Sequence, residues 1–163
     1  MKTLLFTLLL LSVTISATSQ LKAKDLCDPF VIDVLTGQVN QVKADWDPEQ
    51  IKKKFPCFTA TEAENAGAKC GGTITFKDKD LVFFTSRDYI EIGENFKGKL
   101  SLQLIGAARN SFFKTLGHPK LKDANWDAYQ MQYGTMILYY NKAGKVNKVQ
   151  LSTASTEVIS LCE

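Results

Sequence analysis

The chain has 163 residues, of which 45% are hydrophobic and 23% are charged, and its formal net charge is +3. This length is typical of one domain or of two small repeats. The small net charge and the scattered basic side chains exclude the strongly basic surface of proteins that bind nucleic acid or anionic membranes.

The first 19 residues are typical of a signal peptide. Lys2 provides a positive start, residues 4–13 form an apolar run too short to span a bilayer, and small residues up to Ser19 form a cleavage site. The first cysteine, Cys27, does not follow a pair of small residues, so we expect no lipid anchor. We expect cleavage near Ser19 and a secreted or periplasmic protein of about 144 residues without stable membrane insertion.

Four cysteines follow the signal peptide, and an even number in an oxidising compartment predicts two disulfides. We favour Cys57–Cys70, which would close a loop between a helix end and a strand start, and Cys27–Cys162, which would join the two termini of the mature chain. The alternative connectivity is Cys27–Cys57 with Cys70–Cys162. The cysteine spacing does not indicate a metal site, and we expect no cofactor.

The first half of the mature chain begins with an apolar run at residues 30–35, which predicts an edge strand. A helix is expected next, with Asp47 as N-cap, Ile51 and Phe55 on one face, and Pro56 as the stop. The run Lys52-Lys53-Lys54 is expected to be a solvated face of this helix. Two further strands are expected at residues 81–85 and 89–92.

The second half begins with a predicted amphipathic helix between Gly106 and Pro119. Phe112 and Leu116 would stack on one face, and Gly117 would end the helix. The strand-like runs that follow predict a β-meander. They cover residues 126–129, 131–133, 135–140 and 145–151.

The two halves match each other when one is shifted by 61 residues, which places Ile51 on Phe112 and Phe55 on Leu116. This agreement predicts an α+β fold of two tandem helix-plus-antiparallel-β-meander repeats that form one sheet with helices on one face. The predicted division is a signal peptide at 1–19, a first repeat with an N-terminal strand at 20–95, and a second repeat with a C-terminal segment at 96–163.

Several short motifs of the second half together resemble a known family. They are Gly106, Phe112, Leu116-Gly117-His118-Pro119, Trp126 with Tyr129, and Gly144-Lys145-Val146. In this pattern the chain resembles the SmpA/OmlA-type envelope lipoproteins and the fold-related β-lactamase inhibitory proteins. The resemblance implies a tandem helix-plus-meander fold and a non-catalytic role in envelope assembly or hydrolase inhibition. The chain departs from the pattern at Ala108, where the family has Ser or Thr, and in the Trp-x-x-Tyr spacing.

The sequence contains no strong combination of catalytic residue types. The single histidine, His118, lies between Gly117 and Pro119 and is most simply a turn residue without an orienting partner. We therefore expect that the protein is not an enzyme.

The strands at residues 81–84 and 136–140 are apolar on both alternate faces. They could be central strands covered on both sides, or they could leave an aromatic face open for another protein. On the second interpretation Phe84 and Tyr139 occupy matching positions and Tyr133 is their neighbour. An alternative function is a small carrier in which the same aromatic side chains line a cleft for an apolar ligand. Trp46 and Trp126 are expected in the core or as wedges between helix and sheet.

Overall fold

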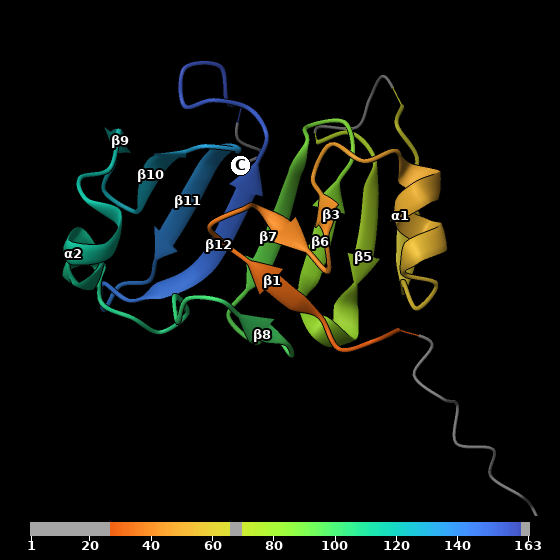
Figure 1. Cartoon of the computed structure of the whole chain (residues 1–163), viewed down its shortest axis with the longest axis horizontal. Coiled ribbons are helices and arrows are strands. Elements are labelled where there is room, and N and C mark those ends of the chain that lie inside the picture. Colours follow the sequence, from red (N-terminus) through yellow and green to blue (C-terminus); the bar gives the residue numbers. More distant parts are fainter. Residues whose placement is uncertain (1–26, 66–69, 161–163) are drawn as a thin grey trace, which may run out of the picture.

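A sheet of eight strands organises the fold in the computed structural model (Figure 1), which describes residues 27–65 and 70–160. The strand order is β4-β5-β6-β7-β12-β11-β10-β9, and every neighbouring pair is antiparallel. The central pair, β7 with β12, joins strands that are distant in the sequence. The bounds are β4 Ala60–Glu62, β5 Thr73–Phe76, β6 Leu81–Phe84, β7 Tyr89–Gly93, β9 Leu121–Lys122, β10 Trp126–Met131, β11 Gly134–Tyr140 and β12 Val146–Ser152.

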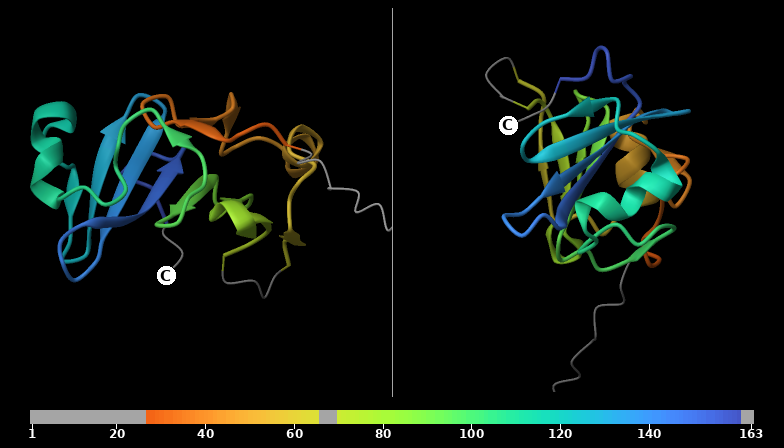
Figure 2. Two further views of the ribbon diagram at one scale, coloured as in Figure 1. Left: turned by 90° about the horizontal axis from the view of Figure 1, so that it is seen from below. Right: turned by 90° about the vertical axis from the view of Figure 1, so that its left-hand side faces the viewer.

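A second, smaller sheet lies against one face of the first (Figure 2). Its order is β3-β2-β1-β8, with β1 parallel to β8. The bounds are β1 Val31–Asp33, β2 Gln38–Val39, β3 Val42–Lys43 and β8 Lys99–Leu100. The predicted edge strand at residues 30–35 is therefore β1, and it lies inside the small sheet rather than at an edge.

The helices are short. Helix α1 (Pro48–Lys54) begins where predicted, because the Asp47 carboxylate accepts a hydrogen bond of 2.9 Å from the Glu49 backbone N–H. Helix α2 (Phe113–Leu116) has only four residues and follows the 3₁₀ turn η2 (Arg109–Phe112). A second 3₁₀ turn, η1 (Lys77–Lys79), connects β5 to β6.

The core lies between the two sheets and under α1. Alternate residues of the large sheet point into it, so that Leu81 and Phe83 are fully buried while Val82 and Phe84 on the other face are half-buried. Four phenylalanine rings, from the residue before β1, the C-cap of α1, β5 and β6, meet there with centroid separations of 5.1 to 6.1 Å. They are Phe30, Phe55, Phe76 and Phe83.

The predicted fold class is wrong. The chain is mostly β, with one sheet of four strands and one of eight, and only two short helices in the described residues, instead of helix-plus-meander repeats forming a single sheet. Three strands of the small sheet have only two residues, which is too few to show an alternating pattern. The short helix expected between Gly106 and Pro119 is present as the 3₁₀ turn η2 followed by the single α-helical turn α2, and it ends at Gly117 as predicted. Phe112 is buried in it, whereas its neighbour Phe113 is 56% exposed.

The favoured disulfide pairs are wrong as well. Cys27 is bonded to Cys57, with their Cα atoms 5.6 Å apart, which excludes both Cys57–Cys70 and Cys27–Cys162. The reason is the packing of Phe55 against Phe30: Cys27 lies three residues before Phe30, and Cys57 two residues after Phe55, so the two cysteines meet. Cys70 is also disulfide-bonded. Cys162 and the predicted signal peptide lie outside the described residues.

Candidate binding surface

The face of the large sheet that points away from the small sheet is the candidate site, and we call it the outer face. Both helices of the described chain lie elsewhere: α1 packs on the core side and α2 at one end of the sheet (Figures 1 and 2). Strand register places aromatic and polar side chains together on this face. Its central residues are Val82 and Phe84 on β6, Tyr89 and Glu91 on β7, Lys148 and Gln150 on β12, and Ile137 and Tyr139 on β11.

Phe84 and Tyr89 form a stacked pair at one side of the outer face. They are directly opposite each other on β6 and β7, and their ring centroids are 4.3 Å apart with an interplanar angle of 21°. Tyr89 is only 1% exposed, and its hydroxyl has no hydrogen-bond partner among the residues that the structure describes. Burial, with a further contribution from the charge of Glu91, raises the pKa of Tyr89.

A polar cluster lies beside this stack. The Tyr139 hydroxyl donates to Gln150 Oε1 over 3.0 Å, and Gln150 Nε2 donates to Glu91 Oε2 over 2.8 Å. Lys148 Nζ is 3.4 Å from the same Glu91 oxygen and 4.2 Å from the centroid of the Tyr139 ring. The cluster therefore links three adjacent strands and holds the Tyr139 ring in one place.

The chain after β12 limits the outer face at one end. Thr135 Oγ1 donates to the Ala154 carbonyl over 2.7 Å, and both the backbone N–H and the hydroxyl of Thr156 donate to Gln130 Oε1. Thr135 and Thr156 are buried by these contacts. On the rest of the outer face Phe84, Tyr139, Glu91 and Lys148 are half-buried, whereas Tyr89, Ile137 and Gln150 are at most 1% exposed.

The structure brings two of the three predicted binding residues to one face. Phe84 and Tyr139 both lie on the outer face, separated by β7 and β12, which corresponds to a lateral distance of about 14 Å. Tyr133 lies apart from them in the β10–β11 turn. Its hydroxyl donates to the Val34 carbonyl over 3.2 Å, and its ring packs so closely on Gly37 that a Cβ there would be 2.4 Å away.

Sequence reasoning missed the polar half of the surface, namely Glu91, Lys148 and Gln150, together with Tyr89. The available signal was the alternation of β7, where Tyr89 and Glu91 take one face and two isoleucines the other. The sequence interpretation considered only the apolar runs.

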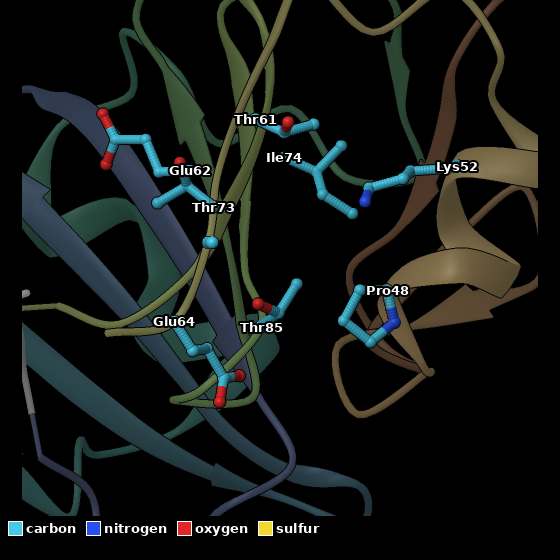
Figure 3. A pocket seen from close by; sticks show the side chains of 9 residues that line it. Pro48, Lys52, Thr61, Glu62, Glu64, Thr73, Ile74 and Thr85 are labelled. Carbon is cyan, nitrogen blue, oxygen red and sulfur yellow. The ribbon is translucent and has the colours of Figure 1, made fainter. Parts of the chain in front are cut away.

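Other depressions do not combine catalytic groups. One of about 160 Å³ lies between α1 and the β4–β5 edge and is lined by threonines, Glu62 and Glu64 (Figure 3). Lys52 extends toward it from α1 in Figure 3, but its ammonium group is 2.8 Å from Glu49. His118 is exposed and packs edge-on against Phe113 with ring centroids 4.5 Å apart.

A further depression, of about 370 Å³, lies near α2, and its lining includes an ion pair between Arg109 and Asp127. Arg109 Nε and Nη2 donate to the two carboxylate oxygens of Asp127, and Arg109 also donates to backbone carbonyls of the β9–β10 turn. This hydrogen bonding raises the pKa of Arg109. The guanidinium group thus holds the turn in place.

Within residues 27–65 and 70–160, no three histidine, cysteine or acidic side chains come close enough to hold a metal ion. The same residues contain no helix with the length and apolar character needed to cross a membrane. Comparison of the sequence with protein-family models and with curated proteins, and of the structure with solved structures, gave no match.

Proposed function

We propose that this protein is an exported, non-catalytic binding module that recognises another protein through the outer face. The observation that carries the proposal is that Phe84 and Tyr139 remain half-buried on a sheet face that neither helix covers, with the fully buried Tyr89 stacked on Phe84. Aromatic side chains beside satisfied polar groups are typical of protein–protein interfaces.

The alternative, a carrier of small apolar ligands, needs a cavity between the sheet and its helices. That space holds the rings of Phe30, Phe55, Phe76 and Phe83, packed at centroid distances of 5.1 to 6.1 Å. Phe84 and Tyr139 point to the opposite side of the sheet. The geometry therefore favours a surface that meets a partner over a pocket that encloses a ligand.

A photocrosslinking experiment tests the proposal. A photoreactive phenylalanine analogue is placed at the half-buried Val82 on the outer face, or at the exposed Phe113 near α2 as a control. The tagged proteins are irradiated in native envelope or extracellular fluid. We expect one recurring crosslinked protein from position 82 and none from position 113.

Alanine variants then measure the contribution of the aromatic side chains. Phe84→Ala and Tyr139→Ala are each expected to weaken binding of the identified partner at least about tenfold, as buried aromatic anchors do. Phe113→Ala, which removes an exposed ring elsewhere, should bind like the wild type. Equal binding by all three variants, with unchanged unfolding midpoints, would contradict the proposed surface.

A further inference from the structure

A tryptophan that the sequence interpretation placed in the core or as a wedge is instead at the surface beside α1. Trp46 is 36% exposed, and with Gln50, Lys53 and Lys54 it lines an open depression of about 350 Å³. Gln50 is followed by Lys53 and Lys54 at intervals of three and four, which places the three on one face of α1, and Trp46, which directly precedes the N-cap, lines the same depression. This volume is at the lower end of the range of small-molecule sites, about 300–1,000 Å³.

The depression carries two ammonium groups that no acidic side chain neutralises. Lys52 pairs with Glu49 at 2.8 Å, whereas Lys53 and Lys54 are exposed and form no ion pair with another described residue. The nearby Asp47 carboxylate is occupied by the helix N-terminus, where it accepts hydrogen bonds from two backbone N–H groups. The lining of the depression thus bears two positive charges and no carboxylate, with Asp45 and Asp47 next to Trp46 in the chain, and this lining complements an anionic ligand.

The helix that carries these residues is firmly attached to the rest of the molecule. Ile51 is fully buried and Phe55 is 2% exposed. The Cys27–Cys57 disulfide fixes the chain directly after the helix. A ligand would thus meet side chains on a rigid support, which lowers the conformational cost of binding.

We propose that this depression binds an acidic saccharide, a sugar ring that bears a carboxylate or sulfate group. The exposed indole of Trp46 offers a flat apolar surface for the C–H face of a sugar ring. The Gln50 amide supplies both donors and an acceptor, which match ring hydroxyls. Lys53 and Lys54 supply the positive charge for the anionic substituent.

A nucleic acid fits the same site less well. Proteins that bind single strands combine several stacking aromatic side chains with a positively charged groove that follows the phosphate backbone. Here a single tryptophan and two lysines occupy one depression. The proposed saccharide site is on α1, away from the outer face, so it does not depend on the protein-binding proposal.

Tryptophan fluorescence of the full-length mature protein tests the proposal. Trp126 is first replaced by phenylalanine, which leaves Trp46 as the only tryptophan. A heparin tetrasaccharide is then titrated at low ionic strength, with the uncharged cellotetraose in parallel. We expect a saturable change in Trp46 emission with the heparin tetrasaccharide, and binding of cellotetraose at least about tenfold weaker because it makes no ionic contact.

Charge-matched variants identify the site. Lys53→Gln/Lys54→Gln is expected to weaken binding of the heparin tetrasaccharide about tenfold, because two exposed ionic contacts are lost. Lys114→Gln/Lys120→Gln, with the same change in net charge near α2, should leave binding unchanged. Equal weakening by both variants, or no saturable change, would overturn the proposal. Tighter binding of an eight-residue oligothymidylate would overturn the saccharide class in favour of a nucleic acid.

Discussion

Replacing Arg109 by methionine would remove the contact that joins turn η2 to strand β10. Arg109 Nε lies 2.9 Å from Asp127 Oδ2 and Nη2 lies 2.5 Å from Oδ1, and the Asp127 side chain is only 4% exposed. The Tyr140 hydroxyl donates to the same carboxylate over 2.9 Å. Methionine fills a similar volume but leaves this buried carboxylate without its counter-charge.

Arg109→Met is expected to lower the free energy of unfolding by about 3–5 kcal/mol, the range for removing one partner of a buried ion pair. The carboxylate keeps only the Tyr140 hydrogen bond, which itself contributes about 1.5–3 kcal/mol because its acceptor is charged. Replacing both partners, as in Arg109→Met/Asp127→Leu, should cost less than the sum of the two single changes, since no unpaired charge remains.

Urea unfolding followed by tryptophan fluorescence measures these free energies, and a double-mutant cycle gives the coupling. Lys52→Met is a matched control, because it breaks the exposed pair with Glu49 and should cost about 0.5 kcal/mol or less. A cost below about 1 kcal/mol for Arg109→Met, or additive costs in the double variant, would refute the view that this ion pair anchors the β9–β10 turn.

Two further predictions concern the disulfide and the tyrosines. Cys27→Ser/Cys57→Ser should lower the free energy of unfolding by about 3.6 kcal/mol, from the 30-residue separation that the bridge closes; a urea midpoint equal to that of the wild type would contradict this. Desolvation raises the pKa of four tyrosines, most strongly that of three, so in the folded protein these three stay neutral where unfolded tyrosines, of pKa about 10, ionise. The stability from these groups is fully present below pH 10 and is lost as the pH rises above it, so their phenolate absorbance should appear only together with unfolding. Reversible ionisation of all five tyrosines in the folded protein would contradict it. The three are Tyr89, Tyr133 and Tyr140.

Elements with strong local signals were predictable from the sequence. Helix α1 begins at Pro48 because Asp47 caps it, and both residues are readable without a structure. The runs that became β6, β7, β11 and β12 were also recognisable, because apolar or alternating runs of four to seven residues carry a local pattern. The two-residue strands of the small sheet carry none, since their pairing depends on partners elsewhere in the chain.

The disulfide pairing also depends on contacts between distant parts of the chain, which the sequence does not reveal. Loop closure within one half of the chain favoured Cys57–Cys70, but the packing of Phe55 on Phe30 decided the outcome. Likewise, the sequence indicated Phe84 and Tyr139 as surface aromatics, but only the register shows them on a common face and Tyr133 elsewhere. Non-local contacts of this kind leave no periodic trace in a single sequence.

The polar cluster of the outer face restricts the kind of partner that can bind there. A wholly apolar partner surface would bury the Glu91 carboxylate and the Lys148 ammonium group away from water, and that desolvation is costly unless the partner supplies hydrogen bonds. The Phe84–Tyr89 stack, by contrast, is already ordered, so covering it costs little side-chain entropy. The proposed function therefore favours a partner that places apolar groups over Phe84 and polar groups over Glu91 and Lys148. Selection between partners would then depend on the polar cluster, and affinity on the stack.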